Sequence, residues 1–122
     1  MSVKIKRGFV YLADLNPKMG TEPGKIRPVL VLQTDLLNNV HPSTIVSPLT
    51  TNVQNKARVL RVHLKKNQAG LSKDSDIMID QMRAIDNRRF VKELGEVPRR
   101  ILEDVYKNVG IVIDFHEKAA NS

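Results

Sequence analysis

A glycine-punctuated polar loop that turns directly into a strand constrains the fold of this chain more than any other stretch. Gly20 and Gly24 permit backbone angles that other residues avoid. Pro28 lacks an N–H and suits the first position of a strand, and residues 29–32 form an apolar run long enough for a buried strand. The sequence thus predicts a core strand that holds the Arg27 guanidinium beside a flexible loop. This arrangement suits binding of an anionic oxygen, and the alternative is a hairpin loop with one solvated arginine.

Short strands separated by turn signals form most of the remaining pattern. Apolar runs and alternating stretches predict strands over residues 8–14, 28–33, 45–49, 58–66, 76–86 and 94–97. A helical turn is expected over residues 34–39, and Pro98 opens a C-terminal helix. Apolar residues at helical spacing predict the buried stripe of that helix: Ile101, Leu102, Val105, Val109 and Val112. The sequence therefore predicts a mainly β fold with α additions, a small and partly open β-barrel that ends in a helix.

Two of the predicted strands carry polar side chains on one face. In residues 58–66 the alternation places Arg61, His63 and Lys65 on a basic outer face, which we interpret as solvated. In residues 76–86, Gln81 and Arg83 interrupt an otherwise apolar row of side chains. Their end of the strand is therefore expected to emerge from the core.

Length and charge limit the classes of function that fit the chain. Its 122 residues favour one domain over residues 1–122, with a basic arm (1–7) and a tail (116–122) that are expected to fray. The sequence holds no cysteine, which excludes disulfides and thiolate metal sites, and it shows no signal peptide and no apolar run of membrane-spanning length. A cytoplasmic location is expected. The net charge of +7 favours an anionic partner such as nucleic acid, an acidic protein segment or a membrane surface.

Motifs for metal-dependent or nucleophilic hydrolysis are missing from the sequence. His41, His63 and His116 lie far apart, and no H-x-x-x-H or H-E-x-x-H spacing occurs. There is no G-x-S-x-G elbow, and the glycines at 20 and 24 lack the G-K-[ST] of a phosphate-binding P-loop. No metal and no cofactor are predicted.

Five segments of the sequence resemble the MazF/PemK toxin family. They are residues 8–17 (GFVYLADLNP), 20–33 (GTEPGKIRPVLVLQ), 44–50 (TIVSPLT), 80–86 (DQMRAID) and 113–115 (IDF). The segments follow one another in the family's order and cover nearly the whole chain. The resemblance implies an SH3-like barrel of the CcdB/PemK type. It also implies a ribosome-independent, sequence-specific endoribonuclease toxin that a cognate antitoxin neutralises.

The resemblance also implies which residues act on RNA. RNA can be cut without a metal, because its own 2′-OH attacks the neighbouring phosphate and leaves a 2′,3′-cyclic phosphate and a 5′-OH. The family's catalytic arginine matches Arg27, expected as phosphate stabiliser and proton-transfer partner. Its Thr or Ser after the third strand matches Thr50, expected to hydrogen-bond the scissile phosphate or leaving oxygen; without the resemblance it reads as an ST-turn. Residues expected to bind substrate are Gly20, Thr21, Glu22, Lys25, Thr51, Gln81 and Arg83.

The expected partners are single-stranded RNA, an antitoxin with an acidic, initially disordered segment, and a second copy of the chain in a homodimer. No membrane partner is expected. Two other functions remain open at the level of sequence. A CcdB-like topoisomerase poison would use the same barrel without nuclease chemistry, and a plain basic barrel would bind RNA without cutting it. Arg27, Thr50 and the loop before Pro28 favour the nuclease.

Overall fold

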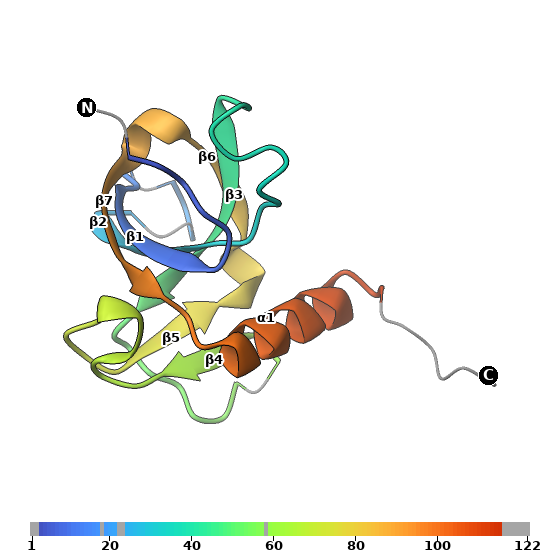
Figure 1. The fold of residues 1–122 in the computed structure, drawn as a ribbon. Helices are drawn as coiled ribbons and strands as arrows, with labels where there is room; N and C mark the ends of the chain where they lie inside the picture. The colour runs from blue at the N-terminus through green and yellow to red at the C-terminus, as the bar shows by residue number, and fades with distance from the viewer. Residues whose placement is uncertain (1–2, 18, 22–23, 58, 116–122) are drawn as a thin grey trace.

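The computed structural model describes residues 3–17, 19–21, 24–57 and 59–115, which form an antiparallel sheet followed by one long helix (Figure 1). The strands are β1 (Phe9–Asp14), β2 (Ile26–Val31), β3 (Ser43–Thr50), β4 (Arg61–Leu64), β5 (Ser75–Met78), β6 (Arg83–Asp86) and β7 (Phe90–Glu96). Three 3-10 turns, η1 (Gln68–Gly70), η2 (Ile79–Gln81) and η3 (Asn87–Arg89), lie between strands. The helix is α1 (Arg99–Val112).

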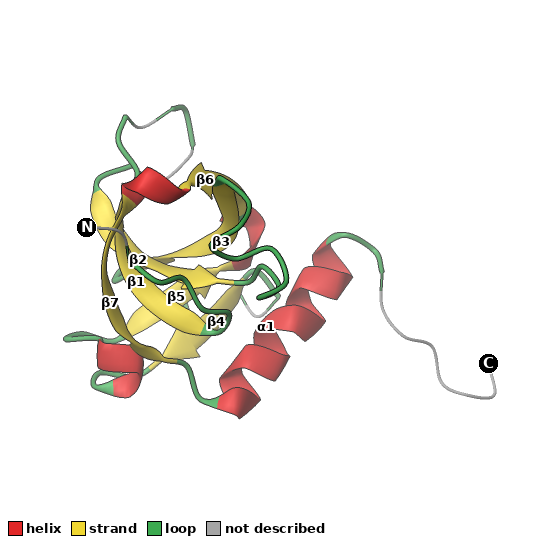
Figure 2. Ribbon diagram, turned by 45° about the horizontal axis from the view of Figure 1, so that its top comes forward, coloured by secondary structure: helices red, strands yellow, loops and turns green. Residues whose placement is uncertain are grey.

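The sheet curves strongly, and its strands follow the order β4-β5-β3-β2-β1-β7, with β6 also paired to β3 (Figure 2). Among the described strands no ladder joins β4 to β7, so the sheet does not close. The η1 turn packs on β7 instead. Gly70 and Gly95 allow this approach: a Cβ on Gly70 would collide with the Leu94 carbonyl, and one on Gly95 would lie 2.8 Å from the Ala69 carbonyl carbon. The mainly β fold with a C-terminal helix agrees with the sequence prediction.

Hydrophobic cores lie on both faces of the central strands. Val10 belongs to one buried cluster and its neighbour Tyr11 to the other, which explains why both faces of β1 are apolar in the sequence. The first cluster includes Leu30, Leu49, Leu64, Ile77 and Val105. The second includes Ala13, Val29, Val46, Ile85 and Phe90. The middle of β2 and most of β3 are thus packed on both faces, and this packing supports the residues at the neighbouring strand ends.

The helix begins after Pro98, as predicted, and covers the first cluster beside β4 (Figure 1). Val105 is fully buried, and Ile101, Leu102 and Val109 pack against the cluster. Val112, expected in the buried stripe, is 43% exposed, because the helix has passed the edge of the sheet at its last turn. No helix among the described residues is long and apolar enough to span a membrane.

The long strand predicted over residues 76–86 is wrong, because this segment is broken into β5, η2 and β6. Leu49 pairs with Ile77, and Val46 pairs with Arg83. The two partners on β3 are three residues apart, whereas their partners on the other segment are six residues apart. The surplus three residues form η2. The isoleucines before and after η2 keep the two-residue period of a single strand. The sequence pattern therefore did not indicate that the strand is interrupted.

The basic arm also differs from the frayed terminus that we expected, as far as residues 3–7 are concerned. Ile5 is only 3% exposed. Its backbone N–H donates to Asn39 Oδ1 at 2.8 Å, and its carbonyl accepts from Asn39 Nδ2 at 2.8 Å. The Tyr11 hydroxyl donates to the Lys4 carbonyl at 2.8 Å. The tail predicted over residues 116–122 lies outside the described residues.

Candidate functional site

A polar cleft of about 420 Å³ forms where the loop before β2 meets the end of β3. It brings together Arg27 and Thr50, the two residues that the sequence analysis placed at the chemical centre. Val29 pairs with Pro48 in the β2–β3 ladder, so the residues two positions further along, Arg27 and Thr50, would face each other. The cleft is lined by Lys25, Ile26, Arg27, Pro28, Leu49, Thr50, Thr51, Asn52 and Ser75.

The Arg27 guanidinium is held by backbone carbonyls on two sides. Its Nε donates to the Gly24 carbonyl at 2.9 Å, and its Nη1 donates to the Leu49 carbonyl at 3.1 Å. A guanidinium has five N–H donors, so most of the donors of this half-buried side chain stay available. Among the described carboxylates none forms an ion pair with Arg27. The cation therefore has a fixed position, and none of the described carboxylates neutralises it by direct contact.

Partial burial has an electrostatic consequence for Arg27. Desolvation lowers the pKa of Arg27 below its ordinary value, because removal of water disfavours the charged form. An anionic oxygen entering the cleft would restore the lost solvation of the guanidinium. A lowered pKa also makes the cation a better proton donor than a solvated arginine.

Thr50 ends β3 and turns its hydroxyl toward the following loop. Its Oγ1 accepts a hydrogen bond from the Asn52 N–H at 3.2 Å, which is the ST-turn that the sequence allowed. A hydroxyl that accepts from one N–H still has its own proton to donate. The ST-turn and a role in chemistry are therefore compatible at this position.

Lys25 adds a second cation at the rim of the cleft. Its backbone has a positive φ of 69°, and both of its backbone polar groups are bonded. The Lys25 N–H donates to Asn16 Oδ1 at 2.8 Å, and the Lys25 carbonyl accepts from the Leu15 N–H at 2.8 Å. The exposed side chain is thus anchored at its base, next to the half-buried Arg27.

Other expected substrate-binding residues do not line this cleft. Thr21 and Gly20 are exposed in the loop that precedes it, and Gly20 has the positive φ of 56° that suits glycine. Glu22 lies outside the described residues. Gln81 is half-buried in η2 and Arg83 is half-buried at the start of β6, opposite Val46 rather than Thr50. Any contact of Gln81 or Arg83 with a ligand in the cleft requires a ligand that extends along β3.

The structure adds residues that the sequence analysis missed. Asn52 and Ser75 line the cleft. Asp76, next to Ser75, is a buried carboxylate at 2% exposure that contacts both Arg61 and His63. The basic outer face of β4 is therefore not simply solvated. The only sequence signal was an acidic residue at the start of an apolar run, and its partners depend on strand register.

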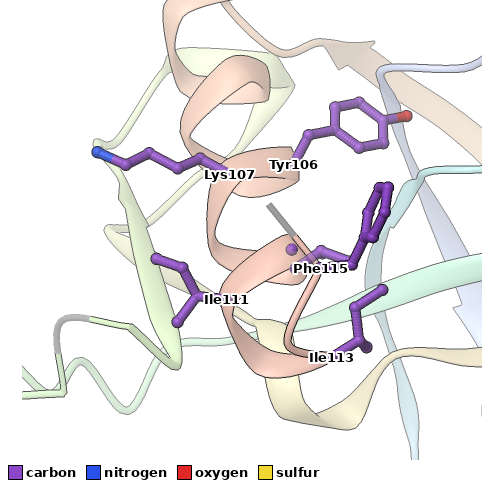
Figure 3. Close-up of a pocket in the computed structure, with 7 residues that line it drawn as sticks. Tyr106, Lys107, Ile111, Ile113 and Phe115 are labelled. Atoms are coloured by element: carbon purple, nitrogen blue, oxygen red, sulfur yellow. The ribbon is translucent and has the colours of Figure 1, made fainter. Parts of the chain in front are cut away.

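Two further observations limit the chemistry. Within the described part of the chain, no group of three His, Asp or Glu side chains is arranged to hold a metal ion. A larger groove of about 830 Å³ lies on the last turns of α1, where Tyr106, Ile113 and Phe115 project to one side of the helix (Figure 3). The groove is mostly apolar and has one charged side chain, Lys107. It is better suited to packing against a protein than to catalysis.

Comparison with known sequences identifies relatives of the whole described fold. Residues 6–113 match the family model of the PemK-like, MazF-like toxins of type II toxin–antitoxin systems. The chain is 35% identical to the endoribonuclease EndoA of Bacillus subtilis over 114 residues, which cover 91% of this chain and 98% of EndoA.

Solved structures show the same architecture. MazF of Deinococcus radiodurans superposes with a TM-score of 0.79 at 26% identity, covering 92% of this chain and 98% of that one. A MazE–MazF structure from the same organism gives a TM-score of 0.68 at 25% identity, covering 92% and 98% of the two chains. The predicted resemblance is thereby confirmed. The comparisons do not favour the alternative of a topoisomerase poison.

Proposed function

We propose that this chain, which belongs to the PemK-like, MazF-like toxins of type II toxin–antitoxin systems, is an endoribonuclease that cuts single-stranded RNA in the cleft between β2 and β3. The observation that carries the proposal is the Arg27 guanidinium, fixed by two carbonyls and left without a described carboxylate partner beside the Thr50 hydroxyl. The endoribonuclease EndoA, similar to this chain over nearly its whole length, supports the reaction class.

Arg27 would act on the phosphorus at the point of reaction. When the RNA 2′-oxygen attacks the adjacent phosphorus, the bond to the 5′-oxygen breaks and negative charge accumulates on the phosphoryl oxygens. A preoriented guanidinium meets that added charge without reorganising. The products are a 2′,3′-cyclic phosphate and a 5′-OH, and no water or metal enters the balance.

Two protons must move in this reaction, one from the 2′-OH and one to the 5′-oxygen. Arg27, whose pKa burial lowers, is the candidate donor to the leaving oxygen. The 2′-OH releases its proton to solvent, and a proton from solvent restores the guanidinium, so that no net proton is gained or lost. The Thr50 hydroxyl donates a hydrogen bond to a phosphoryl oxygen or to the leaving oxygen, while its own oxygen accepts from the Asn52 N–H. Lys25 and the exposed Thr51 hold neighbouring phosphates, and the loop around Thr21 guides the strand into the cleft.

The proposed substrate is mRNA in the cytoplasm, cut at a specific sequence and independently of the ribosome. RNA bound in the cleft would extend along β3 toward Gln81 and Arg83. The amide and guanidinium donors of these two residues would recognise the bases. Both side chains are only half-buried, so we expect them to contact a bound strand that extends beyond the cleft.

We further propose that an antitoxin neutralises the chain, since the similar MazF of Deinococcus radiodurans is known in a structure with MazE. The net charge of +7 favours an acidic antitoxin segment that orders on binding. The affinity of the pair should fall as salt rises, because screening weakens attraction between exposed charges. An affinity that is indifferent to salt would refute the acidic segment.

The experiment that tests the proposed function is cleavage of a long RNA in the presence of chelator, with the new 5′ ends mapped by sequencing. We expect cuts at one short sequence, with 5′-hydroxyl and 2′,3′-cyclic phosphate ends. A substrate with 2′-hydrogen at the cut site should resist cleavage, because it lacks the nucleophile. Cutting of that deoxy substrate at the RNA rate would refute the mechanism. RNA that is bound but never cut would support a plain RNA-binding barrel.

A further inference from the structure

Asp76 lies at the centre of a row of polar residues that crosses three strands. It pairs with Thr50 of β3 on one side and with His63 of β4 on the other. Directly opposed residues of antiparallel strands project from the same face, with Cβ atoms about 4.5–5.5 Å apart. The carboxylate therefore projects on the same face as the Thr50 hydroxyl, one strand away from it.

The Asp76 carboxylate is buried but fully partnered. Its Oδ2 accepts from the Gln54 N–H at 2.8 Å and from Arg61 Nη1 at 3.2 Å. Its Oδ1 lies 3.2 Å from His63 Nδ1. A buried carboxylate is costly to desolvate, and such a group is tolerated when its oxygens are hydrogen-bonded. Asp76 is not among the described residues that line the cleft, and the three contacts above all go to protein groups.

These contacts hold the loop that follows Thr50 at two points. Asp76 binds the Gln54 N–H directly. Arg61, oriented by the same carboxylate, donates through Nη1 to the Asn52 carbonyl at 3.0 Å. The Asn52 N–H in turn donates to Thr50 Oγ1. The buried carboxylate is thus connected to the hydroxyl in the cleft by hydrogen bonds that meet at the Asn52 backbone.

We infer that Asp76 is a positioning residue for the nuclease reaction: through Arg61 and the Gln54 N–H it fixes residues 51–54, and through the Asn52 N–H it fixes the orientation of the Thr50 hydroxyl. The inference rests on the proposed function of the cleft. It assigns a role in kcat to a side chain that touches neither the substrate nor the reacting atoms. A misplacement of about 1 Å in a reacting group can cost about a hundredfold in rate, so a loop tether of this kind has a measurable effect.

The test combines Asp76→Asn with Thr50→Ala in a double-mutant cycle, with amide hydrogen exchange measured by NMR on the same proteins. Asp76→Asn keeps the side-chain shape but removes the charge that orients Arg61. The matched control is Asp86→Asn, which breaks an exposed pair with Arg88 (2.9 Å) that has no bond to the loop. Arg61→Gln is the second variant, for the case that Asp76→Asn fails to fold. It removes the bonds of Arg61 to the Asn52 carbonyl and to Asp76, and it leaves the bond between Asp76 and the Gln54 N–H in place.

We expect Asp76→Asn to lower kcat at least about tenfold, with KM changed less than about threefold, and to speed exchange of the Asn52 N–H at least about tenfold. In the Thr50→Ala background the same substitution should lower kcat less than about twofold, because the group that it positions is gone. Arg61→Gln should show the same pattern more weakly, and Asp86→Asn should leave kcat, KM and exchange at Asn52 unchanged.

If Asp76→Asn lowers kcat by the same factor in the Thr50→Ala background as in the wild-type background, the inference is overturned. Such a result would show a general structural effect that does not depend on the Thr50 hydroxyl. Unchanged exchange at Asn52 in both the Asp76→Asn and the Arg61→Gln proteins would overturn it as well. Wild-type protein that cuts no RNA would refute the proposed function instead. In that case the exchange measurement alone still decides whether Asp76 holds the loop.

Discussion

At the scale of single residues, the site depends on side chains whose backbone is fixed by strand packing. Arg27 and Thr50 lie 23 positions apart in the sequence, and the β2–β3 ladder brings them together. The resemblance predicted that both residues act in one site, and both line one cleft in the structure. Their roles in the reaction stay predictions. The resemblance could not predict Asp76, because the partners of a buried carboxylate follow from register across two ladders rather than from any local motif.

Thr50 offers a prediction with a close internal control. Thr50→Val removes the hydroxyl at nearly constant volume and should slow single-turnover cleavage by about a hundredfold, the lower end of the range for loss of one transition-state donor. Thr50→Ser should stay within about threefold of wild type, because it keeps the donor.

The control for this prediction is Thr34→Val. Thr34 Oγ1 accepts from the Leu36 N–H at 3.2 Å, in an ST-turn with the same distance as that of Thr50 but outside the cleft. Loss of the Thr34 hydroxyl should affect the stability of the protein and not the rate of cleavage. Equal rates for Thr50→Val and Thr34→Val would show that Thr50 serves only the turn.

At the scale of elements, β7 is not joined to β4 by a strand ladder among the described strands. It is in close backbone contact with the η1 turn instead. Gly70 has a positive φ of 71° and no space for a Cβ beside Leu94. We predict that Gly70→Ala lowers the free energy of unfolding by more than the about 1–3 kcal/mol of backbone strain alone, because a steric clash is added.

The matched control is Gly20→Ala. Gly20 also has a positive φ, 56°, but a Cβ added there would meet no heavy atom within 4 Å among the described residues other than its chain neighbours, so only backbone strain should appear. Urea unfolding of both variants measures the difference. A Gly70→Ala protein no less stable than Gly20→Ala would contradict the close packing of η1 on β7.

Tyr11 ties the basic arm to the sheet and predicts a pH dependence. Burial raises the pKa of Tyr11 from its ordinary value of 10.0 to about 12. The folded state therefore holds this proton in a range where the unfolded chain loses it, and the free energy of unfolding should fall as pH rises from about 10 to about 12. Tyr11→Phe should flatten this decline. The free energy of unfolding of both proteins is measured with urea across this pH window. An equally steep decline in wild type and in Tyr11→Phe would refute the prediction.

The elements also show where sequence patterns stop being informative. Apolar periodicity predicted β1, β2, the core of β3 and the start of α1, because each of these buries a continuous apolar surface. It failed at residues 76–86, where η2 inserts three residues without disturbing the alternation. The burial of Ile5 was also hidden, since a lone apolar residue between lysines gives no period.

At the scale of the whole molecule, the polar cleft and the apolar end of α1 divide two tasks. Ile111, Val112, Ile113 and Phe115 are 43%, 43%, 57% and 77% exposed, an unusual concentration of apolar surface. We predict that this face packs against a second copy in a homodimer, since two-fold dimers are the commonest oligomers. That the described fold forms one domain stays a prediction as well.

Sedimentation at micromolar concentration tests the dimer. Wild-type protein should sediment as a dimer and Ile113→Asp should shift it toward monomer, because an uncompensated charge at an interface is costly. The control is Val91→Asp on β7, where the side chain is similarly exposed at 51% but lies outside the α1 groove. A wild-type monomer, or an Ile113→Asp dimer as stable as the control, would contradict the prediction.

The central claim is that Arg27 stabilises the transition state more than it binds RNA. It is tested most directly by comparing cleavage and affinity in Arg27→Ala, with uncleavable 2′-deoxy RNA as the binding probe. Cleavage should fall by about a hundredfold or more, and Arg27→Lys should rescue poorly, because an ammonium lacks the planar fork. Affinity should fall much less, with a salt slope reduced by about one phosphate contact, and exposed Arg100→Ala should leave cleavage unchanged. If Arg27→Ala loses affinity as much as it loses cleavage, Arg27 is a docking residue and the account of the site is wrong.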